Sequence, residues 1–308
     1  MGDTATMLDA SKKAKPIKFT CYRYAVIPNG QIGLWQDVEF SKRHVVDELI
    51  RYCSDTAPYP SSFNGVESVL FYTRPIGETA HLLKFCRKQR LRRFEIETDL
   101  SDVIPRVLDT YPFVYVIVDT GQQTVMVQKK STVFKSAGGA KASLTAMVKQ
   151  FLSDDNYYFS LDEITASSSF WETIESADEV YDVTLKLQSP NFLGSGYATT
   201  ELLNRIRKVT NNDYVDITLS NSSGELEMPR DEYGDTIDYV TAGGGSWSTT
   251  VASGGSKRVT HKSDDFAKVI EVRVSEDAPL DDSEIIVAIR GVGQRKGTIN
   301  ESVDVGSQ

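Results

Sequence analysis

Alternating hydrophobic and polar positions along the chain predict more strands than helices. Residues 17–26 alternate strong β-forming side chains, and residues 32–35 resume that pattern after the turn signal Pro28-Asn29-Gly30, which predicts a hairpin. Two apolar runs, residues 113–119 and 124–128, are joined by a short polar turn and predict a second hairpin. Further strands are predicted at residues 66–72, 94–97, 157–161, 181–187, 214–219, 268–274 and 285–289.

Apolar residues spaced three and four positions apart predict the helices. The first follows Ser41, a suitable N-cap, and places Val45, Val46, Leu49, Ile50 and Cys53 on one face. A second is predicted over residues 78–91 and a third around residues 144–152. Ser169 and Glu172 have the spacing of a capping box and start a short helix. The last, over residues 200–209, places on one face Leu202, Leu203, Ile206 and Val209.

The order of these elements predicts an α+β fold with a largely antiparallel or mixed sheet and several packed helices. Strand-helix-strand units are too few and irregular for a doubly wound parallel fold. We expect a flexible arm over residues 1–16, an α+β N-terminal domain over residues 17–154 and an α+β C-terminal domain over residues 155–308. Within the last, residues 243–256 are rich in glycine, serine and threonine and predict a surface loop.

Composition places the protein among ordinary globular proteins, with 40% hydrophobic and 25% charged residues. The apolar runs are far shorter than the roughly 18 residues of a membrane span, and the first residues lack the apolar core of a signal peptide. A cytoplasmic protein without membrane insertion is therefore expected. The 3 cysteines are widely spaced, which predicts neither a disulfide framework nor a zinc site.

Candidate catalytic residues are few, so the protein is predicted to be non-catalytic and to need no cofactor. None of the 3 histidines, at positions 44, 81 and 261, has the spacing of a metal site or lies in a nucleophile motif. One pattern remains. Asp119, Gln128 and Lys130 have the order of a restriction-endonuclease-like site, in which a carboxylate holds Mg²⁺ and a lysine assists the attacking water. A magnesium-dependent nuclease is therefore the alternative prediction.

Basic residues cluster locally although the net charge is −9, which argues against a protein coated in positive charge. On the helix predicted over residues 78–91, Lys84, Lys88 and Arg92 would form one stripe that can neutralise successive phosphates. The alternative is a solvated face that pairs with some of the 43 acidic residues. A second basic set comprises Lys129, Lys130, Lys135 and Lys141, which would form one groove with the first if the two lie side by side. The residues predicted to bind nucleic acid are Lys84, Arg87, Lys88, Arg90, Arg92, Arg93, Lys129 and Lys130, with Lys257 and Arg258 beside the glycine-rich loop.

Residues 66–226 resemble the RexA phage-exclusion proteins of lambdoid prophages in the order of their elements. The resemblance rests on Val69-Leu70-Phe71-Tyr72-Thr73, on the hairpin that begins at Phe113, on the helix over residues 144–152 and on Val183-Thr184-Leu185-Lys186-Leu187. The segment Leu187-Gln188-Ser189-Pro190-Asn191 and the Gly224-Glu225-Leu226 turn are similar to abortive-infection-associated proteins, and KwaB of the Kiwa defence system is a more distant relative.

The resemblance implies a phage-defence protein of the abortive-infection type that binds DNA and forms homodimers. We therefore expect it to bind nucleic acid, DNA rather than RNA, or a phage component, together with a partner effector protein. A protein-interaction scaffold of a defence complex would equally explain the acidity of the chain and its lack of catalytic motifs.

Overall fold

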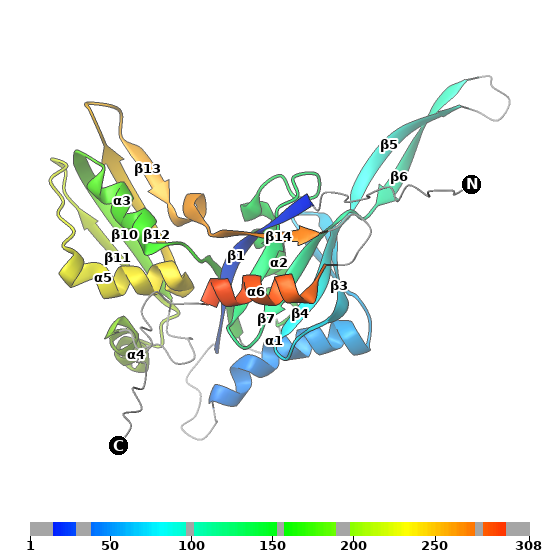
Figure 1. Ribbon diagram of the computed structural model, residues 1–308, viewed down its shortest axis with the longest axis horizontal. Coiled ribbons are helices and arrows are strands. Elements are labelled where there is room, and N and C mark those ends of the chain that lie inside the picture. The colour runs from blue at the N-terminus through cyan, green and yellow to red at the C-terminus, as the bar shows by residue number, and fades with distance from the viewer. Residues whose placement is uncertain are drawn as a thin grey trace, which may run out of the picture.

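The structure, a computed structural model, describes residues 15–28, 38–96, 102–152, 157–188, 198–274 and 280–293. Over these residues the chain forms two antiparallel sheets, a two-stranded ribbon and six packed helices (Figure 1). The predicted α+β class is therefore confirmed. Of the arm expected over residues 1–16, residues 1–14 lie outside the described residues, as does the predicted strand at residues 32–35. The last two residues of that arm, Lys15 and Pro16, instead begin a strand, because they pair with Val274 and Arg273.

The large sheet is organised around β1 (Lys15–Pro28), which pairs with three strands. Its first half pairs with β14 (Val269–Val274) and its second half with β9 (Tyr157–Glu163), while β8 pairs along its other edge. The sheet then continues, every neighbour antiparallel, through β8 (Thr124–Gln128), β7 (Phe113–Asp119), β4 (Ala80–Arg87), β3 (Val66–Ile76) and β2 (Tyr59–Phe63).

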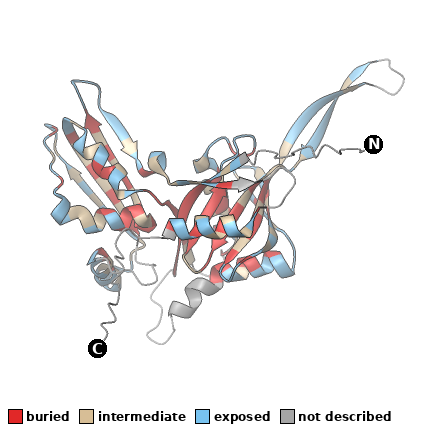
Figure 2. Ribbon diagram, viewed as in Figure 1, coloured by how far each residue is buried: buried red, intermediate tan, exposed pale blue. Residues whose placement is uncertain are grey.

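Both faces of the large sheet are apolar at its centre, because neighbouring residues of a strand point to opposite faces. We call the first the helix-pair face. There Leu83 and Phe85 pack beneath α1 (Val38–Asp55) and α2 (Ala137–Phe151). On the other, the α6 face, Leu82 and Ile117 pack beneath α6 (Asp282–Gly293). Figure 2 shows the buried strands between these layers.

The small sheet has the order β11–β10–β12–β13 and its own core. Its strands are β10 (Glu179–Gln188), β11 (Tyr214–Ser220), β12 (Gly245–Ala252) and β13 (Val259–Lys262). Its core contains Phe170, Leu185, Ile237 and Trp247. The helices of this part are α3 (Ser167–Glu175), α4 (Ala198–Thr210) and α5 (Arg230–Tyr239).

The two sheets are joined by β1 and by the turn that follows α5. The Arg23 guanidinium on β1 donates hydrogen bonds to the carbonyls of Ala242 (2.7 Å) and Gln122 (2.6 Å), and Thr165 N–H donates to the Thr241 carbonyl (2.8 Å). The expected boundary at residue 154 does not separate the two sheets, because β9, β14 and α6 all follow it and complete the large sheet.

Three predicted elements change type. The helix expected over residues 78–91 is β4 followed by β5 (Gln89–Ile96), and β5 also contains most of the strand expected at residues 94–97. The strand expected at residues 285–289 is α6, and the loop expected over residues 243–256 contains the central strand β12. Apolar residues on both faces of β4 imitate a helical pattern, since a strand buried on both sides does not alternate.

Two smaller expectations also differ. α3 begins at Ser167 with Ala166 as N-cap, so Ser169 lies inside the helix and forms no capping box. On α4, Leu203 is buried, whereas Leu202 and Val209 are exposed. The strand β6 (Val103–Thr110), which the pattern did not predict, pairs with β5 to form the ribbon.

Candidate nucleic-acid interface

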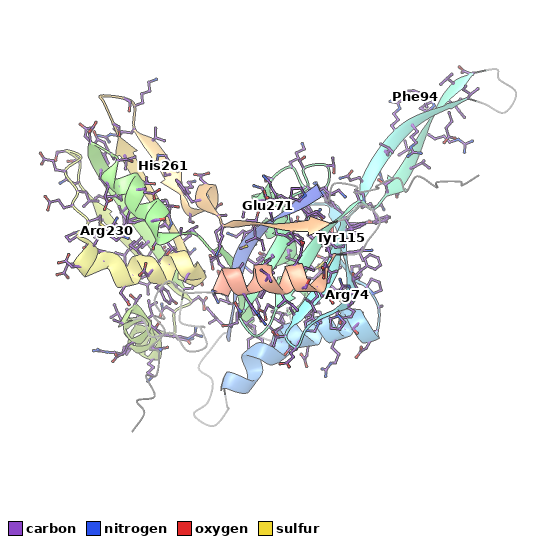
Figure 3. All side chains as sticks on the ribbon, viewed as in Figure 1. Arg74, Phe94, Tyr115, Arg230, His261 and Glu271 are labelled. Carbon is purple, nitrogen blue, oxygen red and sulfur yellow. The ribbon has the colours of Figure 1, made fainter. Side chains whose placement is uncertain are left out.

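A row of aromatic and basic side chains crosses three strands of the α6 face. Strand register places Phe71 of β3 beside Lys84 of β4, and Lys84 beside Tyr115 of β7 (Figure 3). Phe71 is 38% exposed, and Lys84 and Tyr115 are half-buried. The Phe71 ring is accessible to solvent beside the positive charge of Lys84.

Phe113 joins two basic segments that are far apart in the sequence. The Lys84 ammonium lies 4.9 Å from the centre of the Phe113 ring, and the Lys130 ammonium lies 5.3 Å from it. Lys130 also donates a hydrogen bond to the Phe113 carbonyl (3.4 Å), and the Tyr115 ring meets Phe113 edge-on. We call these five residues, Phe71, Lys84, Phe113, Tyr115 and Lys130, the aromatic platform.

A cavity of about 240 Å³ opens on the helix-pair face, at the loop between β8 and α2, and Lys130 is the platform residue that also lines it. Lys129, Lys130, Lys135 and the first residues of α2 line it. All three lysines are exposed, and no described acidic side chain forms an ion pair with them. The N-terminal end of a helix carries partial positive charge and free N–H groups, so the whole cavity attracts anions.

The floor of the cavity contains two hydroxyl groups among apolar side chains. Thr20 is buried there, and its hydroxyl has no hydrogen-bond partner of acceptable geometry. The neighbouring Tyr22 hydroxyl makes a long hydrogen bond, 3.4 Å, to the Ala137 carbonyl. Burial, with the nearby Glu163 charge, raises the pKa of Tyr22, so the phenol stays neutral. At the mouth, Ser136 caps α2 by accepting from Gly139 N–H (3.1 Å).

The predicted basic residues divide between several surfaces, because residues 84–93 are strands. Lys84 and Lys130 lie at the platform, and Lys129 and Lys130 line the cavity. Arg87 points to the helix-pair face, where it lies over Phe134 and donates to the Val133 carbonyl (3.2 Å). Lys88 pairs with Glu67 (2.9 Å) and Asp109 (3.2 Å), so its charge is neutralised. The predicted stripe of Lys84, Lys88 and Arg92 is therefore wrong.

The remaining predicted cations lie away from the platform. Arg90, Arg92 and Arg93 extend along β5 in the ribbon, where Arg90 approaches Asp109 and Arg92 lies over Phe94. Lys141, which was expected in the second basic set, forms an ion pair with the buried Glu163 (2.6 Å).

Lys257 and Arg258 lie in the turn between β12 and β13 of the small sheet. The Arg258 guanidinium stacks on the Tyr181 ring at 3.5 Å. In the same turn, Gly254 N–H already donates to the Asp178 carboxylate (2.6 Å). The Gly254 N–H group is therefore already bonded to a carboxylate of the same chain and is not free to bind a phosphate.

The alternative nuclease site does not assemble in the structure. Asp119 pairs with Thr124 at the turn end of the hairpin, and Gln128 lies four residues further along β8, roughly 13 Å away. Asp119 is buried and accepts hydrogen bonds from Thr79 (2.8 Å) and Gly121 N–H (2.9 Å), while Gln128 accepts from Tyr115 N–H (3.0 Å). Over the described residues, no group of three His, Cys, Asp or Glu side chains is placed to hold a metal ion.

The sequence reasoning missed the aromatic half of the interface. Phe113 and Tyr115 are two residues apart on a predicted strand and so share a face. This spacing could have indicated a pair of aromatic side chains on one face. It was not recognised, because a strongly apolar strand is normally buried on both faces. Phe71 had no such signal, because only the pairing of β3 with β4 places it beside Lys84.

Comparisons with protein-family models, with curated proteins and with solved structures found no match to this chain. Within the part of the chain that the structure describes, no helix is both long and apolar enough to cross a membrane.

Proposed function

We propose that this protein binds single-stranded nucleic acid at the aromatic platform, with a backbone phosphate held in the cavity that Lys130 also lines. The observation that carries the proposal is the convergence of Lys84 and Lys130 on the Phe113 ring, together with a cavity that Lys130 shares with two more lysines. DNA is the expected ligand, because the resemblance to phage-exclusion proteins favours it over RNA.

Two kinds of interaction support this function. Bases that stack on exposed rings such as Phe71 gain about 1–3 kcal/mol each, without regard to sequence. Lysines that contact phosphates release bound counterions, so affinity falls as salt rises. A net charge of −9 would repel nucleic acid elsewhere on the surface. Binding would therefore be confined to this site, where free positive charge is concentrated.

The biological role that we propose is phage defence of the abortive-infection type, in the cytoplasm and with a partner effector. Its support is the RexA-like order of elements in the sequence. A plaque assay in bacteria that carry the gene tests this role separately from binding. The role requires that the protein lowers plaque numbers and that Lys84→Glu combined with Lys130→Glu restores them.

Fluorescence anisotropy with a labelled single strand and its duplex tests the binding itself. We expect Lys84→Glu combined with Lys130→Glu to weaken single-strand binding at least tenfold at low salt, and Phe71→Ala to weaken it severalfold. The matched control is Arg205→Glu combined with Lys208→Glu, because both residues are exposed on α4, away from the platform, and the charge change is equal.

Three results would overturn this proposal. The first is absence of binding by the wild-type protein at low salt, and the second is an equal loss of affinity in the control variant. The third is cleavage of the labelled strand with Mg²⁺ that Asp119→Ala abolishes, which would favour the nuclease. If the wild type binds no nucleic acid but retains a protein partner, the scaffold function replaces the proposed one.

A further inference from the structure

The ribbon formed by β5 and β6 projects from the large sheet and is exposed on both faces (Figures 1 and 2). Each strand has 8 residues, a length of about 27 Å. A two-stranded ribbon is at best marginally stable by itself in water. Its outer half packs against no other described element, so a partner that covers it would stabilise it.

The two faces of the ribbon differ in chemistry. Directly paired residues of the two strands lie on the same face of the ribbon. One face contains both charged and apolar residues, in the pairs Leu91–Leu108, Arg93–Arg106 and Glu95–Ile104. The other face, which we call the Phe94 face, contains Phe94–Pro105 at its centre, with Arg92–Val107 towards the base and Ile96–Val103 towards the tip. Phe94 and Ile96 are each 66% exposed, Val107 is 61% exposed and Val103 is 53% exposed.

We infer that the Phe94 face binds the same face of a second copy of this chain, with the two ribbons antiparallel. A twofold axis through the Phe94–Pro105 pair would place Val107 of each copy against Ile96 and Val103 of the other. Such a surface is complementary to itself, as an isologous dimer interface must be.

The charge on this face agrees with the antiparallel arrangement. Arg92 lies one pair towards the base from Phe94, and its guanidinium lies over the Phe94 ring at 5.4 Å. The same twofold axis would therefore keep the Arg92 side chains of the two copies apart. A parallel arrangement would instead place like charges together, which costs free energy.

The exposed area is sufficient for a dimer. The apolar side chains of the Phe94 face expose on the order of 600 Å² per copy. Stable interfaces bury about 600–1,000 Å² per partner. Nucleic acid fits the face less well, because Arg90 approaches Asp109, Arg92 lies over the Phe94 ring and the rest of the exposed surface is apolar.

The dimer would also join two nucleic-acid interfaces. The base of the ribbon is tied to the loop that lines the cavity, since the Gln89 side chain donates to the Thr132 carbonyl (2.9 Å). This consequence rests on the proposed function, whereas the dimer itself does not.

Sedimentation equilibrium over a range of protein concentrations tests the dimer directly. We expect the wild type to dimerise and Phe94→Glu to raise the dimer dissociation constant at least a hundredfold. Ile104→Glu places the same charge on the opposite face and should leave the mass unchanged. Circular dichroism should show that both variants remain folded, because Phe94 lies mostly in solvent.

Oxidative cross-linking gives a second measurement. Phe94→Cys should form a covalent dimer, because the axis brings the two positions together, whereas Arg93→Cys on the other face should not. The native cysteines Cys21, Cys53 and Cys86 are buried and should not interfere. A wild-type protein that stays monomeric, or equal dissociation by Phe94→Glu and Ile104→Glu, would contradict the inference. So would a Phe94→Glu variant that loses DNA binding without a change in mass.

Discussion

Glu163 and Asp162 are buried neighbours on β9, an unusual place for two carboxyl groups. Lys141 of α2 contacts Glu163 at 2.6 Å, and Ser160 donates to Asp162 at 3.0 Å. Burial nevertheless outweighs the lysine charge and raises the pKa of Glu163 to about 7, and it also raises the pKa of Asp162. Ionising Glu163 therefore costs more in the folded protein than in the unfolded chain.

The sign of the resulting pH dependence follows from linkage. A carboxyl group whose pKa is raised by folding contributes stability that is complete below its unfolded pKa and is lost as pH rises through about 7. We expect Glu163→Gln to reduce the fall in stability between about pH 5 and pH 7.5 by on the order of 1 kcal/mol. Thermal unfolding over that range measures this. Glu201→Gln, on an exposed part of α4, should leave the profile unchanged.

At the scale of elements, the predictions succeeded for α1 and α2, which have a solvent-facing side, and for β1 and the β7–β8 hairpin, which are rich in β-forming residues. However, α1 begins at Val38, so Ser41, the expected N-cap, lies inside the helix. The prediction failed at β4, where apolar residues on both faces imitate a helical pattern. In α6, a short apolar run was taken for a strand, although Ile285 and Ile289 are one helical turn apart and both bury against the sheet.

β12 was not predicted for another reason, which is the run of glycines at its start. Gly245 opens the strand with φ of +152°, and a Cβ there would lie 1.9 Å from the Lys186 carbonyl oxygen of β10. Glycine is needed here because the backbones of β12 and β10 approach closely. In the sequence, a run of glycines in such a strand looks the same as one in a flexible loop.

We expect Gly245→Ala to destabilise the protein by several kcal/mol, because β12 must move away from β10 to admit the methyl group. Gly234→Ala is the control. It lies in α5 of the same part of the chain, where a Cβ meets nothing within 4 Å, and should stabilise by about 0.5–1 kcal/mol. Urea unfolding compares the two, and equal stabilities would show that the close approach is absent.

At the scale of the whole molecule, Arg23 connects the two sheets. Its guanidinium reaches the turn after β7 and the turn after α5, and Gly243 leaves room for its stem, since a Cβ at that position would lie 2.5 Å from the Arg23 Cβ. Loss of the side chain would leave two carbonyls, those of Gln122 and Ala242, without this donor.

Arg23→Ala should lower the free energy of unfolding by about 2–4 kcal/mol and reduce the cooperativity between the sheets. In a Trp35→Phe background, tryptophan fluorescence reports on the small sheet, because Trp171 and Trp247 lie in its core, whereas far-ultraviolet circular dichroism reports on both sheets. The two transitions should coincide in the wild type and separate in the variant. Arg51→Ala, at an exposed position of α1, should change neither.

The candidate interface was only partly predictable. Lys84 was identified as part of a helical stripe, which was wrong, and Lys129 and Lys130 as part of a second basic set. Arg87 and Lys88 do not join the platform, because alternation along a strand sends Arg87 to the opposite face and Lys88 lies beside two acids. Clusters in sequence give a surface only when the secondary structure is right.

The sequence by itself determined the α+β class, the main hairpin, the helices with a solvent-facing side and the scarcity of catalytic groups. These are local properties, set by neighbours within a few residues. The tertiary structure alone decided which charges stand free, because Lys84 meets Lys130 through the pairing of β4 with β7, and Lys141 is neutralised by Glu163. It also decided that β9, β14 and α6 return to the large sheet, since strand pairing depends on contacts between distant segments.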